Sequence, residues 1–119
     1  MTSLLRGIFL TSNIPNETAK FYQEVAEISL KQVGDPETYA YWRLDENNFQ
    51  IAIHDAAKFA EYTHPAHRES NLTHLYFKID SQEEFLQHIS KLGITPYSKD
   101  DVVITLEDPD CRKVMFGTA

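Results

Sequence analysis

Two aspartates flank a proline near the end of the chain, at Asp108 and Asp110, and the only cysteine, Cys111, follows them. Paired carboxylates can act as general acid and base, and a thiol becomes a nucleophile when a base or positive charge lowers its pKa. Aspartates beside a proline also stabilise turns through hydrogen bonds to their own backbone. Cys111 would lie at the tip of such a turn, so a turn is favoured over a catalytic site.

Histidines are the next candidates for chemistry. His64 and His67 form an H-P-A-H sequence in a polar segment, where Pro65 disfavours a helix that would bring them together, so we expect a solvated loop. His54 and His74 border apolar, strand-like runs, where a histidine either binds a metal ion or makes a hydrogen bond in a cleft or core. The hydrogen-bonding role is favoured for both, and the sequence contains no zinc-finger or P-loop pattern.

Aromatic side chains on strands form a third group. Alternation along one strand places Tyr39, Tyr41 and Arg43 on one face and Trp42 on the other. One face should line a cleft and the other should pack on a helix or a partner, and the pattern leaves open which is which. Aromatic side chains at such positions usually belong to the core, and stacking on a ligand is the alternative for Trp42 and, similarly, for Tyr76, Tyr97 and Phe9.

The elements that must position these residues occur twice in the same order. A strand, an amphipathic helix and three further strands are predicted in each half, because apolar residues alternate in the strands and recur every three or four positions in the helices. The first half has strands at 5–12, 30–33, 38–44 and 49–54 and a helix at 18–28. The second has strands at 73–79, 95–98, 102–106 and 112–116 and a helix after 81.

Capping residues mark the helix ends. Pro15 suits a first helical turn, because its missing N–H needs no partner there. Ser81 followed by Glu84 forms a capping box, and Gly93 ends the second helix. The sequence thus predicts a single α+β domain at 1–119, with module 1 at about 1–56, a connector at about 57–71 and module 2 at about 72–119.

Composition excludes several classes of protein. The chain has 119 residues, 42% hydrophobic, and a net charge of −7, so we expect one globular core and no basic surface for nucleic acid. No apolar run reaches membrane-spanning length, no signal peptide is recognisable, and a single cysteine excludes an internal disulfide. A cytoplasmic protein that has neither a nucleic acid nor a membrane as a partner is expected.

Three motifs occur in an informative order: Ile14-Pro15 before Phe21-Tyr22, the strand T-H-L-Y-F-K-I-D at 73–80, and Asp108-Pro109-Asp110 before the last strand. Together they resemble the vicinal oxygen chelate superfamily (glyoxalase / bleomycin resistance protein / dioxygenase) over nearly the whole chain. The resemblance implies two βαβββ modules that form a cupped mixed β-sheet with helices outside.

The resemblance also implies positions for a divalent metal ion, one on the first and one on the fourth strand of each module. They fall on Gly7, on the run 49–54, on His74 and on Met115. Gly7 offers no side chain, and a thioether suits soft copper better than hard metals. Within 49–54, Gln50, Ala52 and His54 share one face, and the register is left open.

We therefore expect no cofactor and no standard metal site. His74 with Gln50 or His54 remains the alternative, a non-standard divalent metal site.

The function implied is that of a small-molecule-binding protein, similar to the bleomycin-resistance branch, which sequesters a cationic drug in an acidic, aromatic cleft between two subunits. A homodimer with an unidentified small molecule is thus expected, and module swapping between its chains is left open. The expected cleft residues are His74, Gln50, His54, Trp42, Tyr76 and Met115. Two alternatives stay open: a metal-dependent lyase, isomerase or dioxygenase with a non-standard site, and an interaction module whose cleft is filled by its own side chains.

Overall fold

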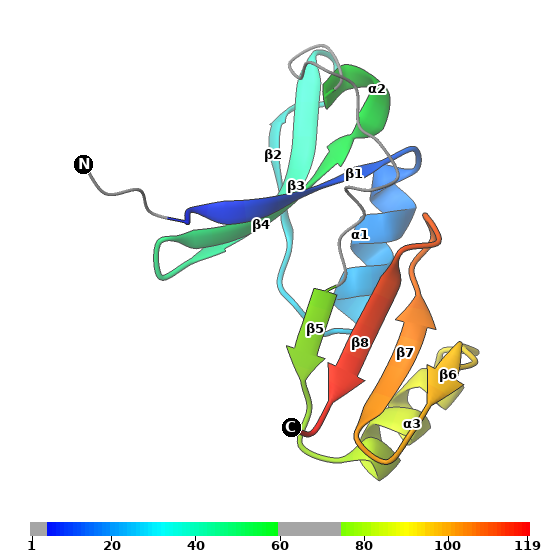
Figure 1. Cartoon of the computed structure of the whole chain (residues 1–119). Helices are drawn as coiled ribbons and strands as arrows, with labels where there is room; N and C mark the ends of the chain where they lie inside the picture. Colours follow the sequence, from blue (N-terminus) through cyan, green and yellow to red (C-terminus); the bar gives the residue numbers. More distant parts are fainter. Residues whose placement is uncertain (1–4, 60–74) are drawn as a thin grey trace.

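The computed structural model describes residues 5–59 and 75–119 (Figure 1). The elements of module 1 are β1 (Gly7–Ser12), α1 (Pro15–Glu24), β2 (Lys31–Asp35), β3 (Tyr39–Glu46), β4 (Phe49–Asp55) and the short α2 (Ala56–Phe59). Those of module 2 are β5 (Leu75–Lys78), α3 (Gln82–Lys91), β6 (Ser98–Lys99), β7 (Val103–Glu107) and β8 (Lys113–Gly117). The predicted repeat of βαβββ is confirmed, and α2 is an addition that the sequence analysis missed.

Each module forms one mixed four-stranded sheet. The strand orders are β1-β4-β3-β2 and β5-β8-β7-β6. In each sheet the first and last strands of the module pair in parallel, and the other pairs are antiparallel. The predicted α+β class is therefore confirmed, with the strands of the described residues divided between two sheets.

Helix α1 begins at Pro15 as predicted but ends at Glu24, so the predicted end at residue 28 was wrong. Glu27 adopts a positive φ of 55°, which turns the chain out of the helix. Ile28 then folds back, and its N–H donates to the carbonyl oxygen of Tyr22 at 3.4 Å. Ile28 still packs against the core. Its match to the apolar pattern of the helix therefore arose from its burial and not from a helical conformation.

Capping and turn residues determine where the chain reverses direction at several points. The Ser81 hydroxyl accepts from the N–H of Glu84 at 3.2 Å at the start of α3, and Gly93 follows the helix with φ 73°. Asn47 and Asn48 have φ of 53° and 63° between β3 and β4. Two successive residues with positive φ make a tight hairpin turn whose twist matches the strands.

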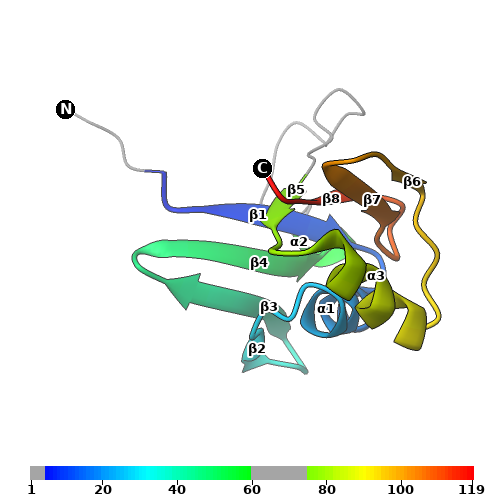
Figure 2. The same ribbon diagram turned by 90° about the horizontal axis from the view of Figure 1, so that it is seen from below.

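The two long helices each cover one face of their own sheet, and α3 lies next to the C-terminal end of α1 (Figure 2). His88 of α3 has its Nε2 2.7 Å from the carbonyl oxygen of Glu24 at the end of α1. Residues of both modules share one hydrophobic cluster, which includes Leu10, Ala19, Tyr22, Val25, Ile53, Leu75, Phe85, Ile89, Ile104, Leu106, Val114 and Phe116. Among the described helices, none combines the length and apolar character needed to cross a membrane.

A buried carboxylate joins the modules. Asp108 is 4% exposed, and its Oδ2 accepts from the hydroxyl of Tyr22 at 2.8 Å and from Nη1 of Arg112 at 2.5 Å. Its Oδ1 accepts the N–H groups of Asp110 and Arg112, both at 2.9 Å. Nη2 of Arg112 continues to the carbonyl oxygen of Thr11 in β1 at 2.7 Å. The turn before β8 is therefore bound to both α1 and β1.

Burial raises the pKa of the Tyr22 hydroxyl far above its usual value, and the charge of Asp108 adds to this effect. Burial alone would lower the pKa of Arg112, but Asp108 and Tyr22 together raise it. The hydroxyl is therefore protonated and donates to the carboxylate, and the guanidinium is charged, at neutral pH.

Asp110 adds a second connection. Its Oδ2 accepts from the hydroxyl of Thr18 at 2.6 Å, and its Oδ1 accepts the N–H of Asn13 at 3.2 Å. The turn role predicted for Asp108 and Asp110 is thus confirmed, and the structure adds their contacts with module 1. Cys111 is exposed and has φ 65°, a conformation that favours glycine.

We predict that Tyr22→Phe lowers the free energy of unfolding by about 2 kcal/mol, because the buried carboxylate of Asp108 loses a donor that water cannot replace. Urea unfolding followed by Trp42 fluorescence measures it. Tyr97→Phe is the matched control, because Tyr97 is 60% exposed, and it should leave stability unchanged. Equal stability of the two variants would mean that the Tyr22–Asp108 contact does not hold the modules together.

Candidate functional site

Each sheet has one face covered by its long helix and an opposite face that we call its open face. Burial alternates accordingly: Leu10 and Ser12 of β1 are 3% and 1% exposed, whereas Phe9 between them is 51% exposed. The open face of module 1 carries Gly7, Phe9, Thr11, Lys31, Val33, Asp35, Tyr39, Tyr41, Arg43, Asp45, Gln50, Ala52 and His54. That of module 2 carries Tyr76, Lys78, Val103, Thr105, Glu107, Lys113, Met115 and Gly117.

His54 lies at the centre of a group of aromatic rings. Its imidazole stacks on Tyr41 at a centroid distance of 4.5 Å and an interplanar angle of 18°. Phe59 of α2 and Phe9 of β1 lie 4.7 and 5.1 Å away. Nδ1 is 2.8 Å from the hydroxyl oxygen of Tyr39. Four rings therefore fix the orientation of one imidazole.

The imidazole is only 6% exposed, and its Nε2 has no hydrogen-bond partner among the described residues. Burial lowers the pKa of His54, so the ring is neutral at pH 7. One ring nitrogen of a neutral imidazole donates and the other accepts. Nε2 is thus a buried polar atom whose partner the described chain does not supply.

Two of the positions implied for a metal ion are neighbours at the other end of β1 and β4. Gly7 pairs with Gln50, and a Cβ at position 7 would lie 2.6 Å from Cγ of Gln50 and 2.5 Å from its carbonyl oxygen. Glycine is required there by this close approach. The amide of Gln50 is therefore the side-chain donor at this pair of positions.

Gln50 and His54 share the open face, which fixes the register of β4, but they cannot hold the same ion. Four residues separate them along one strand, roughly 13 Å at the usual rise per residue, and metal–ligand bonds are near 2 Å. His74 lies outside the described residues. Among the residues that are described, no group of three His, Cys, Asp or Glu side chains could hold a metal ion, so the described donors do not fit a standard metal site.

Module 2 presents the remaining candidates. Met115 is half-buried on its open face and pairs with Tyr76 of β5. Tyr76 is 45% exposed, and its hydroxyl donates to the carbonyl oxygen of Ala119 at 2.8 Å. Both residues thus lie on the face where a cleft was expected, but on the other sheet from His54.

Trp42 faces the other way. It packs against the core on the α1 side of the sheet, and its Nε1 donates to Oδ1 of Asn16 in α1 at 2.9 Å. The structure thus separates Trp42 from His54, and Trp42 does not line the open face. Tyr39, Tyr41 and Arg43 lie on that face instead, which decides between the two alternatives that strand alternation left open.

Phe59 is a site residue that the sequence analysis missed. It follows β4 within a segment that reads as a polar connector, and α2 is a single turn whose apolar residues show no period. The available signal was an isolated aromatic residue just after a strand, and this signal does not indicate which way the side chain points.

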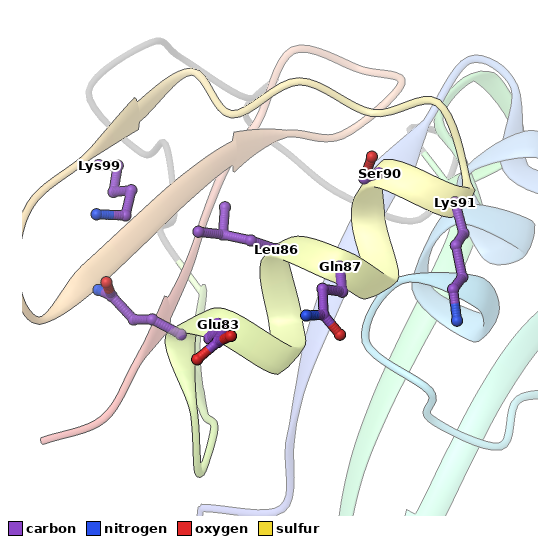
Figure 3. A pocket seen from close by; sticks show the side chains of 7 residues that line it. Glu83, Leu86, Gln87, Ser90, Lys91 and Lys99 are labelled. Carbon is purple, nitrogen blue, oxygen red and sulfur yellow. The ribbon is translucent and has the colours of Figure 1, made fainter.

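A hollow of about 760 Å³ lies over the outward face of α3 (Figure 3). Its lining is mostly polar and charged, and Leu86 is the apolar residue within it. The labelled side chains of Figure 3 spread along one side of the helix rather than converging on a common point. This hollow therefore lacks the converging polar groups of a ligand site, in contrast to the surroundings of His54.

No family model matches the sequence, and no curated protein matches it. Solved structures do match. A lactoylglutathione lyase from Agrobacterium tumefaciens has a TM-score of 0.70 at 15% identity, over 98% of this chain and 94% of that one. The fosfomycin resistance protein FosX from Listeria monocytogenes, complexed with Mn(II) and 1S,2S-dihydroxypropylphosphonic acid, has a TM-score of 0.70 at 20% identity, over 100% and 94%.

A third similar structure is TnmS3, an antibiotic binding protein from a Streptomyces species, with a TM-score of 0.67 at 12% identity over 98% of this chain and 95% of that one. At such identities a common fold is established, and a common activity is not. The coverage is nearly complete in both directions, and the two βαβββ modules are those described above. The chain therefore has the fold of the vicinal oxygen chelate superfamily, which includes glyoxalases and antibiotic resistance proteins.

Proposed function

We propose that the protein binds a small organic molecule on the open face of module 1, without the metal site of the enzymes that share its fold. The observation that carries the proposal is His54: a neutral, buried imidazole, held by four rings, with Nε2 unpartnered among the described residues. A buried polar group without a partner costs about 1–3 kcal/mol. A ligand that hydrogen-bonds to Nε2 would remove this cost.

Phe9 supplies a surface for such a ligand. Its ring is half-exposed and lies beside both His54 and Phe59. Flat apolar groups stack on exposed rings of this kind, and each such contact contributes about 0.5–1.5 kcal/mol beyond area burial.

Binding without a metal ion is supported by the donors at the implied positions. Gly7 has no side chain, and Met115 offers a thioether where a hard cation needs oxygen or nitrogen. Among similar structures, TnmS3 is an antibiotic binding protein and FosX holds Mn(II). The fold thus accommodates both types of protein, and the donor set of this chain favours the first.

A metal-dependent lyase, isomerase or dioxygenase is the second candidate, and one observation favours it. If Nδ1 of His54 donates to Tyr39, Nε2 carries the lone pair, and metal-binding histidines have their other nitrogen hydrogen-bonded in this way. This enzyme would have to draw further ligands from outside the described residues.

The proposal includes a cytoplasmic homodimer in which the ligand lies between the open faces and a second copy. Half-exposed aromatic residues on both sheets, Phe9 and Tyr76, support it, since apolar surface of this kind is commonly buried in an interface.

We predict that the neutral fluorescent probe N-phenyl-1-naphthylamine binds the protein and that Phe9→Ala weakens its affinity about 10-fold, because a stacking surface beside His54 is lost. Fluorescence titration gives the dissociation constants. Leu86→Ala is the control in the hollow over α3 and should have no effect. An affinity that falls in the Leu86 variant and not in the Phe9 variant would move the site to α3.

We predict that untagged protein purified without chelators contains far less than one equivalent of Mn, Fe, Ni or Zn, and that adding these ions leaves its melting temperature unchanged. Elemental analysis and thermal unfolding measure the two quantities. One equivalent of metal per chain that disappears in His54→Phe, a variant that keeps the ring stacking, would favour the enzyme over the binding protein.

We predict a mass near twice the chain mass of 13.7 kDa in light scattering after size exclusion. Tyr76→Glu should shift the protein to a monomer, because it puts a charge on the open face of module 2. Thr95→Glu, on a connecting loop, is the control and should remain a dimer. A wild-type monomer at every concentration would contradict the dimer and leave the ligand-binding proposal standing.

A further inference from the structure

The open face of module 1 carries two cations, Lys31 and Arg43, and two carboxylates, Asp35 and Asp45, in a chain with a net charge of −7. Its two carboxylates are already engaged: Oδ1 of Asp35 accepts the N–H of Glu37 at 2.9 Å, and Oδ2 of Asp45 pairs with Arg6 at 2.6 Å. This pairing lowers the pKa of Asp45, with a smaller contribution from the charge of Arg43. Two cations of the same face, Lys31 and Arg43, make no ion pair with any described residue.

These two cations lie directly opposite each other. Lys31 of β2 pairs with Arg43 of β3 in the antiparallel ladder, so their side chains leave the same face at adjacent positions. Like charges at directly opposed positions repel and destabilise a sheet. An anion placed between them would be attracted to both cations, and these two attractions would offset the repulsion between the cations.

A hollow of about 400 Å³ adjoins the pair, and both Lys31 and Arg43 line it. Its carboxylates are Asp45, which Arg6 already holds, and Glu46, so one carboxylate without an ion pair among the described residues shares the hollow with two cations. A small ligand fits a hollow of this size.

The register also places apolar surface beside the cations. Across the sheet, Arg43 is followed by Ala52 of β4 and then by Phe9 of β1. Two strand spacings separate Arg43 from Phe9, about 10 Å, and the intervening side chain is a methyl group. Tyr41, two residues from Arg43, lies on the same face and stacks on His54. Ala52 itself is fully buried, so a flat molecule would lie across the side chains that cover it, with rings at one end and a guanidinium at the other.

We infer that the ligand of this face is an aromatic or apolar organic acid whose carboxylate, sulfonate or phosphonate group binds between Lys31 and Arg43. The planar guanidinium of Arg43 matches such groups with two parallel hydrogen bonds, and Lys31 adds a point charge. The inference rests on the proposed binding function and gives the ligand a charge opposite to that of the cationic drug that the sequence resemblance suggested.

The test uses two probes with one skeleton: 8-anilinonaphthalene-1-sulfonate, which is an anion, and the neutral N-phenyl-1-naphthylamine. Wild type should bind the sulfonate more tightly. Arg43→Gln should weaken sulfonate binding about 10-fold and Lys31→Gln about 3-fold, because a charged hydrogen bond is lost. Both variants should bind the neutral probe as the wild type does.

Lys20→Gln is the control for net charge, because it removes the same charge from an exposed position on α1, and it should leave sulfonate binding unchanged. The Arg43→Gln variant should melt at or above the wild-type temperature, since the substitution removes a repulsion. A lower melting temperature together with loss of binding of both probes would indicate a structural role for Arg43 and overturn the inference. Sulfonate affinity unchanged by Arg43→Gln would also overturn it.

If the neutral probe binds well and the sulfonate poorly, the anion site fails while the binding function stands. If neither probe binds, both the anion site and the binding function are refuted.

Discussion

The carboxylate of Asp108 is the constraint on which the arrangement of the two modules depends. It accepts from Tyr22 of α1 and from Arg112, which in turn donates to the backbone of β1. A buried carboxylate needs several donors at once, and these donors come from both modules. The modules therefore lie in one orientation, with α1 beside α3 and a shared apolar cluster between them. Everything on the opposite faces of the sheets is positioned by this packing.

Because each module has one long helix, each sheet keeps one face without a long helix over it. On that face in module 1, β3 and β4 present Tyr39, Tyr41 and His54, and β1 adds Phe9. The stacked rings bury the imidazole and keep it neutral, so its chemistry is that of a hydrogen-bonding group or a ligand atom rather than a cation. At two of the positions that the resemblance implies for a metal ion, the chain has glycine at Gly7 and a thioether at Met115.

Net charge is a poor guide to what such a face binds. The acidic residues of this chain lie largely on helices and turns, where carboxylates cap N–H groups, as Asp100 does for Val102 and Val103. The strands of the open face in module 1 carry Asp35 and Asp45, but also Lys31 and Arg43, which make no ion pair with any described residue. A ligand experiences the local field of the surface that it touches, because more distant charges are screened by solvent and salt.

The two βαβββ repeats, the caps at Ser81 and Gly93 and the turn at Asp108 could be predicted from the sequence, because periodicity and turn chemistry act over a few residues. The sequence also shows glycine at Gly7 and a thioether at Met115, two positions that the resemblance implies for a metal ion. Which face of β3 is open became known from the folded structure, which places Trp42 against α1 and Arg43 on the same face as His54. The contact of Phe59 with that imidazole depends on the direction in which α2 leaves β4, and that of Asp108 with Tyr22 joins residues 86 positions apart, so local pattern carries no information about either.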